Sequence, residues 1–308
     1  MNNNIDRTTY LGGGDAPAVL GLSRWNTPLG VWASKTKQIP EPDISDKIAV
    51  KLGLKLEDII AEIFYEETGK KVRRCNDTIY HPEYPFLGGH IDRRIVGEDA
   101  ILEAKTCSAW KAKEWQGEDI PQEYIIQCYH YLAITGAKKA YIAVLIGNQD
   151  FKWKEIHREE KLIRELVKKE VNFWQNYVIT GIMPTQISCN DTDTLYQLFP
   201  QEIAGQEIRL GDEVDALVEG LQGLKADAKA LEMSIGRQEN EIKAIMKDAE
   251  IGITPHYRIH WKAQSRKNID TKLLRKEAPE IATKYERGVS NRYFRITKLK
   301  EETTNGKD

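Results

Sequence analysis

The 308-residue sequence lacks the features that define membrane and secreted proteins. It has no run of about 18 apolar residues, the length that a bilayer-spanning helix requires. Its first residues, Met1 to Arg7, lack the apolar centre of a secretory signal. We therefore expect a cytoplasmic protein. Apolar residues still make up 41% of the chain, enough to build a buried core.

Cysteine is scarce and scattered, and several catalytic signatures are missing. The four cysteines, Cys75, Cys107, Cys128 and Cys189, form no CxxC pair. This spacing argues against zinc knuckles, iron–sulfur sites and a disulfide scaffold. The absence of a GxxxxGK[ST] loop disfavours a helicase or another nucleotide hydrolase. Without a GxSxG elbow, a Ser-His-Asp hydrolase is also disfavoured.

Charge is distributed unevenly along the chain. The 45 basic and 47 acidic residues nearly cancel, but residues 251–300 carry 13 Lys or Arg against 4 Asp or Glu. A polyanion would therefore meet an acidic main domain and a basic C-terminal part. Acidity is compatible with nucleic-acid binding where bound metal neutralises the carboxylates.

The order of predicted elements over residues 1–185 indicates one mixed α/β domain. Residues 45–68 have the apolar spacing of a long helix, which Gly69 ends. Extended segments follow at residues 87–96 and 100–106, joined by a tight turn. A helix over residues 121–135 and two further strands complete the pattern.

The remaining sequence predicts a long helix and a small basic module. Over residues 212–248 apolar positions recur in steps of three and four, the heptad pattern of a coiled coil. This helix would either pack on its own domain or form a subunit contact. We assign residues 186–250 to a linker and this helix, and residues 251–308 to a basic α+β module that ends in a strand over residues 292–298.

The most informative segments are Gly-Gly-His-Ile-Asp92 and Leu-Glu103-Ala-Lys105. Because side chains alternate along a strand, Glu103 and Lys105 point to the same side. The turn between the two segments would bring Asp92 beside Glu103. Two close carboxylates repel unless a cation lies between them, and hard oxygen ligands suit Mg²⁺ or Mn²⁺. Lys105 would orient a water or stabilise charge on a phosphoryl group. The alternative is an exposed hairpin with alternating charges.

Other polar residues are candidates for the same site. Glu57, one residue after Leu56 of the apolar stripe, could reach it from the long helix. Gln127 and Tyr131 lie one turn apart on the next helix and could hold a DNA backbone. Taken alone, Glu57 fits an ordinary acid on a helix surface better than a site residue. The alternative for Gln127 and Tyr131 is a polar edge on a packed helix.

Cations and aromatic residues follow the second strand. Lys111 and Lys113 alternate with Trp110 and Trp115, which would supply charge and stacking surfaces for nucleic acid. His90 faces the same way as Asp92 in an extended segment and could touch a phosphate. The alternative for the segment of residues 110–115 is a solvated loop whose two tryptophans fold inward.

Together these motifs resemble a known family. The set comprises Leu11-Gly-Gly-Gly-Asp-Ala, Gly53-x-x-x-Glu57, Gly-Gly-His-Ile-Asp92, Leu-Glu103-Ala-Lys105 and Gln127-x-x-x-Tyr131. It is similar to the YqaJ-type viral recombinases, the lambda-type branch of phage exonucleases with the PD-(D/E)xK restriction-endonuclease-like fold. The resemblance covers roughly residues 7–180.

The resemblance implies a Mg²⁺-dependent 5′-to-3′ exonuclease on double-stranded DNA ends, with Mn²⁺ as a substitute. It implies metal ligation by Asp92, Glu103 and the Ala104 carbonyl, activation of water by Lys105, and a second metal assisted by Glu57. Arg7 would grip a 5′-phosphate. A single-strand annealing protein would be the partner in phage or prophage recombination within a bacterial cell. A trimeric ring would be the homo-oligomer.

One position departs from the family pattern, since Gly14 stands where a serine is common. The missing hydroxyl removes one donor to a 5′-phosphate, for which the backbone amides of residues 12–14 could substitute. Two other functions stay open. One is a DNA endonuclease with the same metal chemistry, and the other is a DNA-binding or assembly factor without catalysis.

Overall fold

The computed structural model describes residues 6–40, 44–288 and 292–298. The chain divides into two units, Met1–Pro200 and Gln201–Asp308, called here the N-terminal and C-terminal units. Each is described by itself. The boundaries predicted from the sequence, at residues 185 and 250, stay predictions.

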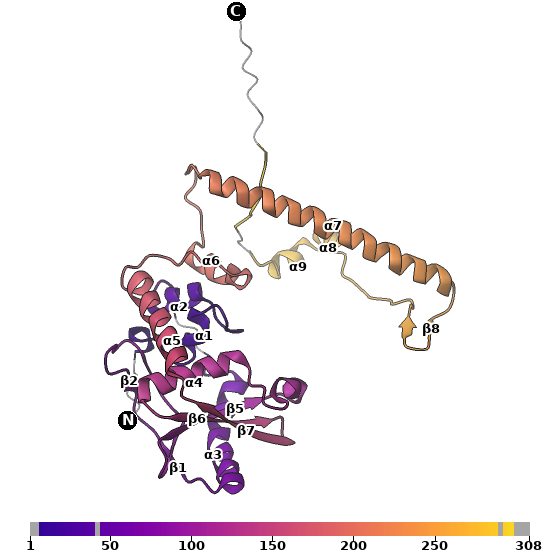
Figure 1. Cartoon of the computed structure of the whole chain (residues 1–308). Coiled ribbons are helices and arrows are strands. Elements are labelled where there is room, and N and C mark those ends of the chain that lie inside the picture. Colours follow the sequence, from indigo (N-terminus) through magenta and orange to yellow (C-terminus); the bar gives the residue numbers. More distant parts are fainter. Residues whose placement is uncertain (1–5, 41–43, 289–291, 299–308) are drawn as a thin grey trace, which may run out of the picture. The chain divides into compact units, whose positions relative to one another are not determined.

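A five-stranded mixed sheet forms the centre of the N-terminal unit (Figure 1). Its strand order is β1-β4-β5-β6-β7, and only the β5–β6 pair is parallel. The chain passes from β5 to β6 through a helix, as parallel neighbours require. The strands are β1 (Val72–Arg74), β4 (Arg93–Ile95), β5 (Ala100–Cys107), β6 (Lys139–Ile146) and β7 (Asp150–His157). A separate pair consists of β2 (Ile79–Tyr80) and β3 (Gly88–Gly89).

Helices cover both faces of this sheet. The long helix α3 (Ile48–Thr68) packs on one face, and Gly69 ends it with a left-handed backbone at φ 70°, as predicted. The other face carries α1 (Asp15–Val19), α2 (Pro28–Lys35), α4 (Gln122–Thr135) and α5 (Glu160–Phe173). Shorter helical segments are η1 (Arg7–Thr9), η2 (Ala109–Trp115), η3 (Trp174–Val178), η4 (Cys189–Asp191) and α6 (Thr192–Leu198).

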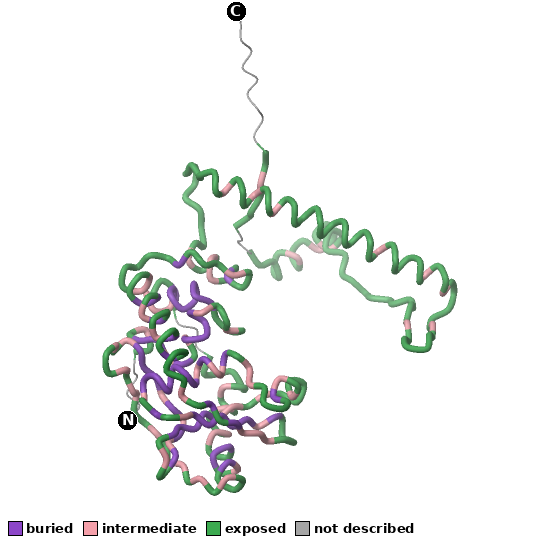
Figure 2. The backbone as a smooth tube through the Cα atoms, viewed as in Figure 1, coloured by how far each residue is buried: buried purple, intermediate pink, exposed green. Residues whose placement is uncertain are grey.

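Alternation along β5 and β6 divides the core into two clusters. Leu102 and Tyr141 pack with Phe64 of α3, whereas Ile101 and Ile142 pack under the helices of the other face. Both clusters lie within the N-terminal unit, where the buried residues of Figure 2 gather. The predicted mixed α/β core, a sheet flanked by helices, is confirmed.

The predicted continuous strand over residues 87–96 is wrong. The segment divides into β3 and β4, and residues 90–92 between them belong to no strand. Hydrogen bonds at the start of the segment explain the break, because the Gly88 amide donates to the Leu11 carbonyl at 3.0 Å rather than extending the main sheet. Asp92 therefore lies in a bend directly before β4.

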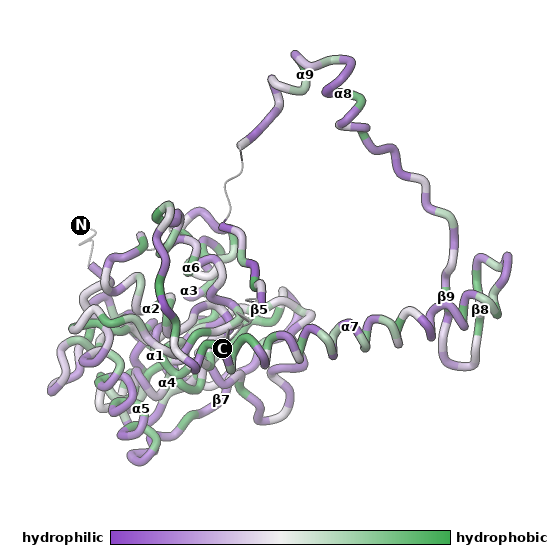
Figure 3. Tube along the Cα trace, turned by 90° about the horizontal axis from the view of Figure 1, so that it is seen from above, coloured by the Kyte–Doolittle hydropathy of each residue, from purple (hydrophilic) through white to green (hydrophobic). Residues whose placement is uncertain are grey.

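The C-terminal unit contains the predicted long helix, α7 (Asp212–Met246). Hydrophobic and hydrophilic residues alternate along it (Figure 3). A hairpin of β8 (Ile251–Ile253) and β9 (Arg258–His260) follows, then α8 (Thr271–Glu277) and α9 (Pro279–Lys284). Pro279 separates the last two helices because proline cannot donate a helical hydrogen bond. Residues 292–298 form no strand, so that prediction is wrong. In the described ranges no helix could cross a membrane.

Candidate active site

Strand β5 brings the predicted acid and amine together. The Lys105 Nζ donates to Glu103 Oε1 at 2.6 Å, which confirms that the two side chains share one side of the strand. Both lie on the α4 side, because Gln127 of α4 donates to the same Glu103 oxygen at 2.8 Å. Ala104 packs toward the α3 cluster, on the opposite face.

Asp92 lies beside this pair, at the bend before β4. The register pairs Arg93 with Leu102, so Asp92 comes level with Glu103. Its Oδ2 accepts a hydrogen bond from the Ala104 amide at 2.8 Å. Burial raises the pKa of the Asp92 carboxyl, which that hydrogen bond and Lys105 partly oppose.

Glu103 is the most strongly perturbed acid of the site. Burial and the neighbouring Asp92 carboxylate raise the pKa of Glu103 to about 8, although Lys105 acts in the opposite direction. Its Oε2 atom is buried and has no hydrogen-bond partner. Because an unpaired buried oxygen is costly, this atom marks a position at which a cation or a donor is expected.

Glu57 belongs to α3, the helix on the sheet face opposite to α4. Burial and Asp92 raise the pKa of the Glu57 carboxyl, so these two acids interact through space. Its Oε2 lies 4.0 Å from Nη1 of the buried Arg93. Arg93 also donates to the Asp92 carbonyl at 2.7 Å and to Asp58 Oδ1 at 2.5 Å. Arg93 thereby ties the Asp92 bend to helix α3.

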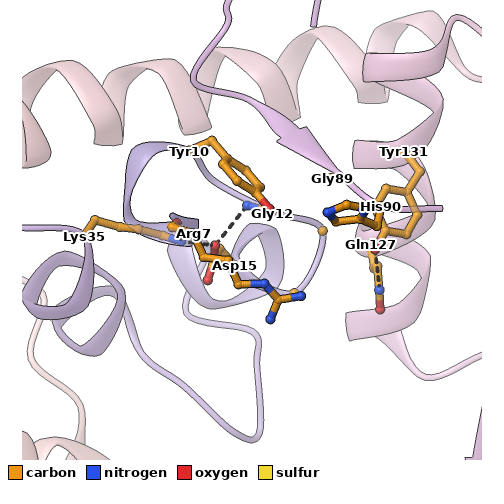
Figure 4. Close-up of a pocket in the computed structure, with 11 residues that line it drawn as sticks. Arg7, Tyr10, Gly12, Asp15, Lys35, Gly89, His90, Gln127 and Tyr131 are labelled. Atoms are coloured by element: carbon orange, nitrogen blue, oxygen red, sulfur yellow. Dashed lines mark hydrogen bonds and ion pairs between the residues drawn. The ribbon is translucent and has the colours of Figure 1, made fainter. Parts of the chain in front are cut away.

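A pocket of about 270 Å³ is lined in part by Gln127, the hydrogen-bond partner of Glu103 (Figure 4). Tyr131 and Gln127 line one side together with His90, and Arg7 lines the other side. The Gln127 amide also donates to the Tyr131 hydroxyl at 3.0 Å. Gln127 lines the pocket and also contacts Glu103, so this side chain links the pocket to the acidic site. Further lining residues are Tyr10, Gly12, Gly13, Gly14, Asp15, Lys35 and Gly89.

Two residues of this pocket have defined partners, His90, which the sequence predicted, and Lys35, which it did not. His90 Nε2 lies 2.9 Å from Thr78 Oγ1, and the His90 ring lines the pocket. His90 lies between β3 and β4 and not in the continuous strand that the sequence had predicted. Lys35 pairs with Asp15 at 2.7 Å and donates to the Arg7 carbonyl at 2.8 Å. Within the described part of the chain, no carboxylate forms an ion pair with Arg7.

The glycine turn packs tightly at one position and is open at the next. A Cβ on Gly13 would lie 2.6 Å from the Tyr131 ring, whereas a Cβ on Gly14 would meet nothing within 4 Å. The Gly12 amide already donates to Asp15 Oδ2 at 2.9 Å. Of the three amides expected to replace the missing serine hydroxyl, that of Gly12 is therefore engaged within the protein.

The cationic segment after β5 forms η2. Lys111 and Lys113 are exposed, and Trp110 is 96% exposed. Trp115 is buried in the core, so the prediction that it offers a stacking surface is wrong. It instead stacks on Tyr124 of α4, with ring centroids 5.6 Å apart.

Sequence reasoning missed three contributors to the site. Arg93 directly follows Asp92, but a single arginine gives no signal that it will be buried. Lys35 and Tyr124 come from distant elements, and only packing brings them to the pocket and to Lys105. The position of Tyr124, three residues before Gln127, was the available signal, because it places both on one helix face.

The donor set suits a hard divalent cation. Asp92 and Glu103 are acids of the type that would supply oxygen ligands, and Glu103 Oε2 is unpaired. Over the described ranges, no three His, Cys, Asp or Glu side chains are arranged to hold one metal ion. A metal here would therefore also need a backbone donor, the role that the Ala104 carbonyl was predicted to fill, and water.

Comparison with known proteins shows the family of this chain. Residues 5–138 match the YqaJ-like viral recombinase domain. The chain is 39% identical over 300 residues to the uncharacterized protein YqaJ of Bacillus subtilis. The aligned region covers 96% of this chain and 93% of that protein. The chain belongs to the YqaJ-like viral recombinase family. All the motif residues quoted for the resemblance lie within the matched YqaJ-like domain.

Two exonucleases are among the solved structures that resemble this YqaJ-like chain. One is the alkaline exonuclease LHK-Exo from Laribacter hongkongensis, at 18% identity and a TM-score of 0.48, covering 55% of this chain and 88% of that one. The other is a phage-related exonuclease from Haemophilus somnus, at 13% identity and a TM-score of 0.42, covering 56% and 94%.

Proposed function

We propose that this protein is a Mg²⁺-dependent deoxyribonuclease that degrades double-stranded DNA from its ends, in the 5′-to-3′ direction. The observation that carries the proposal is the Glu103 carboxylate, buried beside Asp92 and Lys105 with one oxygen unpaired. A buried pair of acids next to an amine is costly to keep without function. Membership of the YqaJ-like viral recombinase family agrees with the proposal.

The chemistry follows from the roles that these side chains can take. When bound by Asp92 and Glu103, a divalent cation would act as a Lewis acid on the scissile phosphodiester. The Lys105 ammonium, held by Glu103, would stabilise negative charge on the phosphoryl oxygens. The Gln127 amide fixes the orientation of Glu103 through its 2.8 Å hydrogen bond. Glu57, which interacts with Asp92 through space, would assist a second metal, as the resemblance implies.

End recognition would use the pocket that Gln127 links to the acids. Arg7 offers a guanidinium without a described carboxylate partner, which suits a terminal phosphate. The backbone of Gly13 and Gly14 lines the same space. Because Gln127 belongs to both places, a phosphate held in the pocket would put the next phosphodiester near Glu103. This juxtaposition supports an exonuclease over an endonuclease.

Nucleotide release from linear duplexes tests the proposal. We expect release from 5′-phosphorylated ends with Mg²⁺, less from 5′-hydroxyl ends, and none after chelation. Glu103→Gln, which preserves side-chain size, is the matched inactive control. Labelling the two ends of one strand separately determines the polarity.

A closed circular duplex separates the alternatives within the same assay. An endonuclease would cut the circle, which an exonuclease leaves intact. Binding to DNA without any Mg²⁺-dependent release would instead identify a non-catalytic DNA-binding or assembly factor. From the resemblance we also infer a single-strand annealing protein as partner and assembly into a ring of subunits.

A further inference from the structure

An aromatic shelf lies beside Lys105, on the side away from the pocket. The Tyr124 ring packs between two tryptophans, with centroid distances of 5.6 Å to Trp115 and 5.9 Å to Trp25. Lys105 Nζ lies 5.0 Å from the centroid of the Tyr124 ring. Trp115 is buried and forms the base, whereas Trp25 is 63% exposed. The shelf, defined as Trp25 and Tyr124, is therefore an open aromatic surface next to a proposed catalytic group.

Ion pairs hold the shelf in place. Arg24, the neighbour of Trp25, donates from Nη1 and Nη2 to the two oxygens of Glu114, at 2.9 and 3.0 Å. Its Nε donates to Glu123 Oε1 at 2.6 Å. The loop that carries Trp25 is thus tied to both η2 and α4. A large exposed ring on a fixed loop is prepared to bind a flat partner, because little freedom is lost on binding.

The positions along α4 indicate which partner reaches the shelf. Tyr131, Gln127 and Tyr124 lie on one helix face, over about 10 Å of the axis at 1.5 Å per residue. Tyr131 lines the pocket, Gln127 contacts Glu103, and Tyr124 supports Trp25. A DNA strand that ends in the pocket and passes its scissile phosphate over Glu103 would continue toward the shelf.

We infer that Trp25, supported by Tyr124, is a stacking subsite for a nucleobase of the degraded strand. This base belongs to the part of the strand that stays in the duplex after the terminal nucleotide is released. This inference rests on the proposed function. Stacking on an aromatic ring is tolerant of base identity, as an enzyme that advances along any sequence requires. The Arg24 guanidinium lies 5.4 Å from the Trp25 ring centroid, and the carboxylates of Glu114 and Glu123 offset its charge.

A cycle that combines a protein change with a DNA change tests the subsite. Binding is measured with Mg²⁺ in the full chain carrying Asp92→Asn, so that the DNA stays intact. The probes are 5′-phosphorylated duplexes, either unmodified or with one abasic nucleotide at the second, third or fourth position. We expect Trp25→Ala to weaken binding of unmodified DNA about 5- to 100-fold. At one abasic position the two Asp92→Asn proteins, with and without Trp25→Ala, should bind alike.

Controls separate stacking from a structural role of Trp25. Trp25→Phe keeps a ring and should retain most of the effect, whereas Trp261→Ala, in the C-terminal unit, should show none. With wild-type Asp92, Trp25→Ala should raise KM for DNA and leave kcat unchanged, because Lys105 stays in place. A fall in kcat with unchanged KM would instead show that Trp25 only positions Tyr124 and Lys105, and would overturn the subsite.

The inference and the proposed function fail in distinguishable ways. Equal weakening by Trp25→Ala for unmodified and abasic DNA at all three positions overturns the subsite, even where the wild-type protein digests DNA normally. Absence of Mg²⁺-dependent digestion by the wild type overturns the proposed function. The binding cycle is measured without digestion and gives its answer in either case.

Discussion

The two units of the chain contain similar patterns of apolar residues but use them differently. In the N-terminal unit the apolar faces of helices and strands close over two buried clusters. In the C-terminal unit the apolar seam of α7 is exposed, and none of the described residues from 201 onward is buried. A periodic pattern is sufficient for a helix, since its hydrogen bonds are local. A raised carboxyl pKa requires burial, which, among the described residues, only the N-terminal unit provides.

The largest difference between the units should appear when an acid is neutralised. Asp92→Asn keeps an oxygen that can accept from the Ala104 amide, so we expect a folded protein. Mg²⁺-dependent nucleotide release should fall by about 10³-fold or more, because the substitution removes a carboxylate proposed to bind the metal. Asp227→Asn, on exposed α7, should keep the wild-type rate. Similar rates for Asp92→Asn and wild type would remove Asp92 from the mechanism.

Lysines in the two units should differ nearly as much. Lys105→Ala should lower kcat about 10²-fold, as expected for a group that stabilises the transition state. Lys243→Ala breaks an exposed ion pair with Glu239 and should change the free energy of unfolding by only about 0.5 kcal/mol. Steady-state kinetics and urea denaturation of both variants make the comparison. Full activity of Lys105→Ala would contradict its assigned role.

Glycine substitutions should have opposite signs in the two units. Gly13→Ala puts a methyl group 2.6 Å from the Tyr131 ring and should destabilise the N-terminal unit by about 1–3 kcal/mol. Gly236→Ala, in the interior of α7 with nothing near its Cβ, should stabilise the helix by about 0.5–1 kcal/mol. Chemical denaturation monitored by circular dichroism measures both. A stable Gly13→Ala protein would show that Tyr131 can move away.

Only in the N-terminal unit should a buried histidine make a pH-dependent contribution to the free energy of unfolding. His130 Nδ1 lies 2.7 Å from Glu170 Oε1, and its Nε2 lies 3.0 Å from the Gly88 carbonyl. Burial lowers the pKa of His130, but Glu170 outweighs it, so the net pKa lies above the usual 6.5. The stabilisation is complete below pH 6.5 and is lost as pH rises through the higher pKa of the folded state.

The measurement is the free energy of unfolding against pH for wild type and Glu170→Gln. The difference between the two should shrink above pH 6.5, because only the wild type has the charged partner. A constant difference across this range would show that His130 does not titrate there.

The smallest effect on the N-terminal unit should come from the seam of α7. Leu224→Asn lies on the heptad pattern and is exposed, so we expect the catalytic rate to stay at the wild-type value. The mass in solution, measured by light scattering, decides between the two predicted uses of the seam. A smaller assembly would establish a subunit contact, and an unchanged mass would favour packing within one chain.

The sequence by itself determined most helices of this protein and the residue types of its candidate site. Period-two alternation placed Glu103 and Lys105 on one side of a strand, and the Lys105–Glu103 hydrogen bond confirms it. Helical spacing predicted α3, α4 and α7 within a few residues, because such patterns depend on local geometry. The family motifs were likewise visible as residue types in order.

Tertiary structure decided which of these groups meet. It broke the segment over residues 87–96 at Asp92, buried Trp115 and Arg93, and brought Trp25 to Tyr124 across about a third of the chain. It also left Glu103 Oε2 without a partner. These features depend on contacts between distant residues and on exclusion of water, which no local pattern records. The residue types of the site can therefore be predicted from the sequence, whereas the geometry of the site depends on tertiary packing.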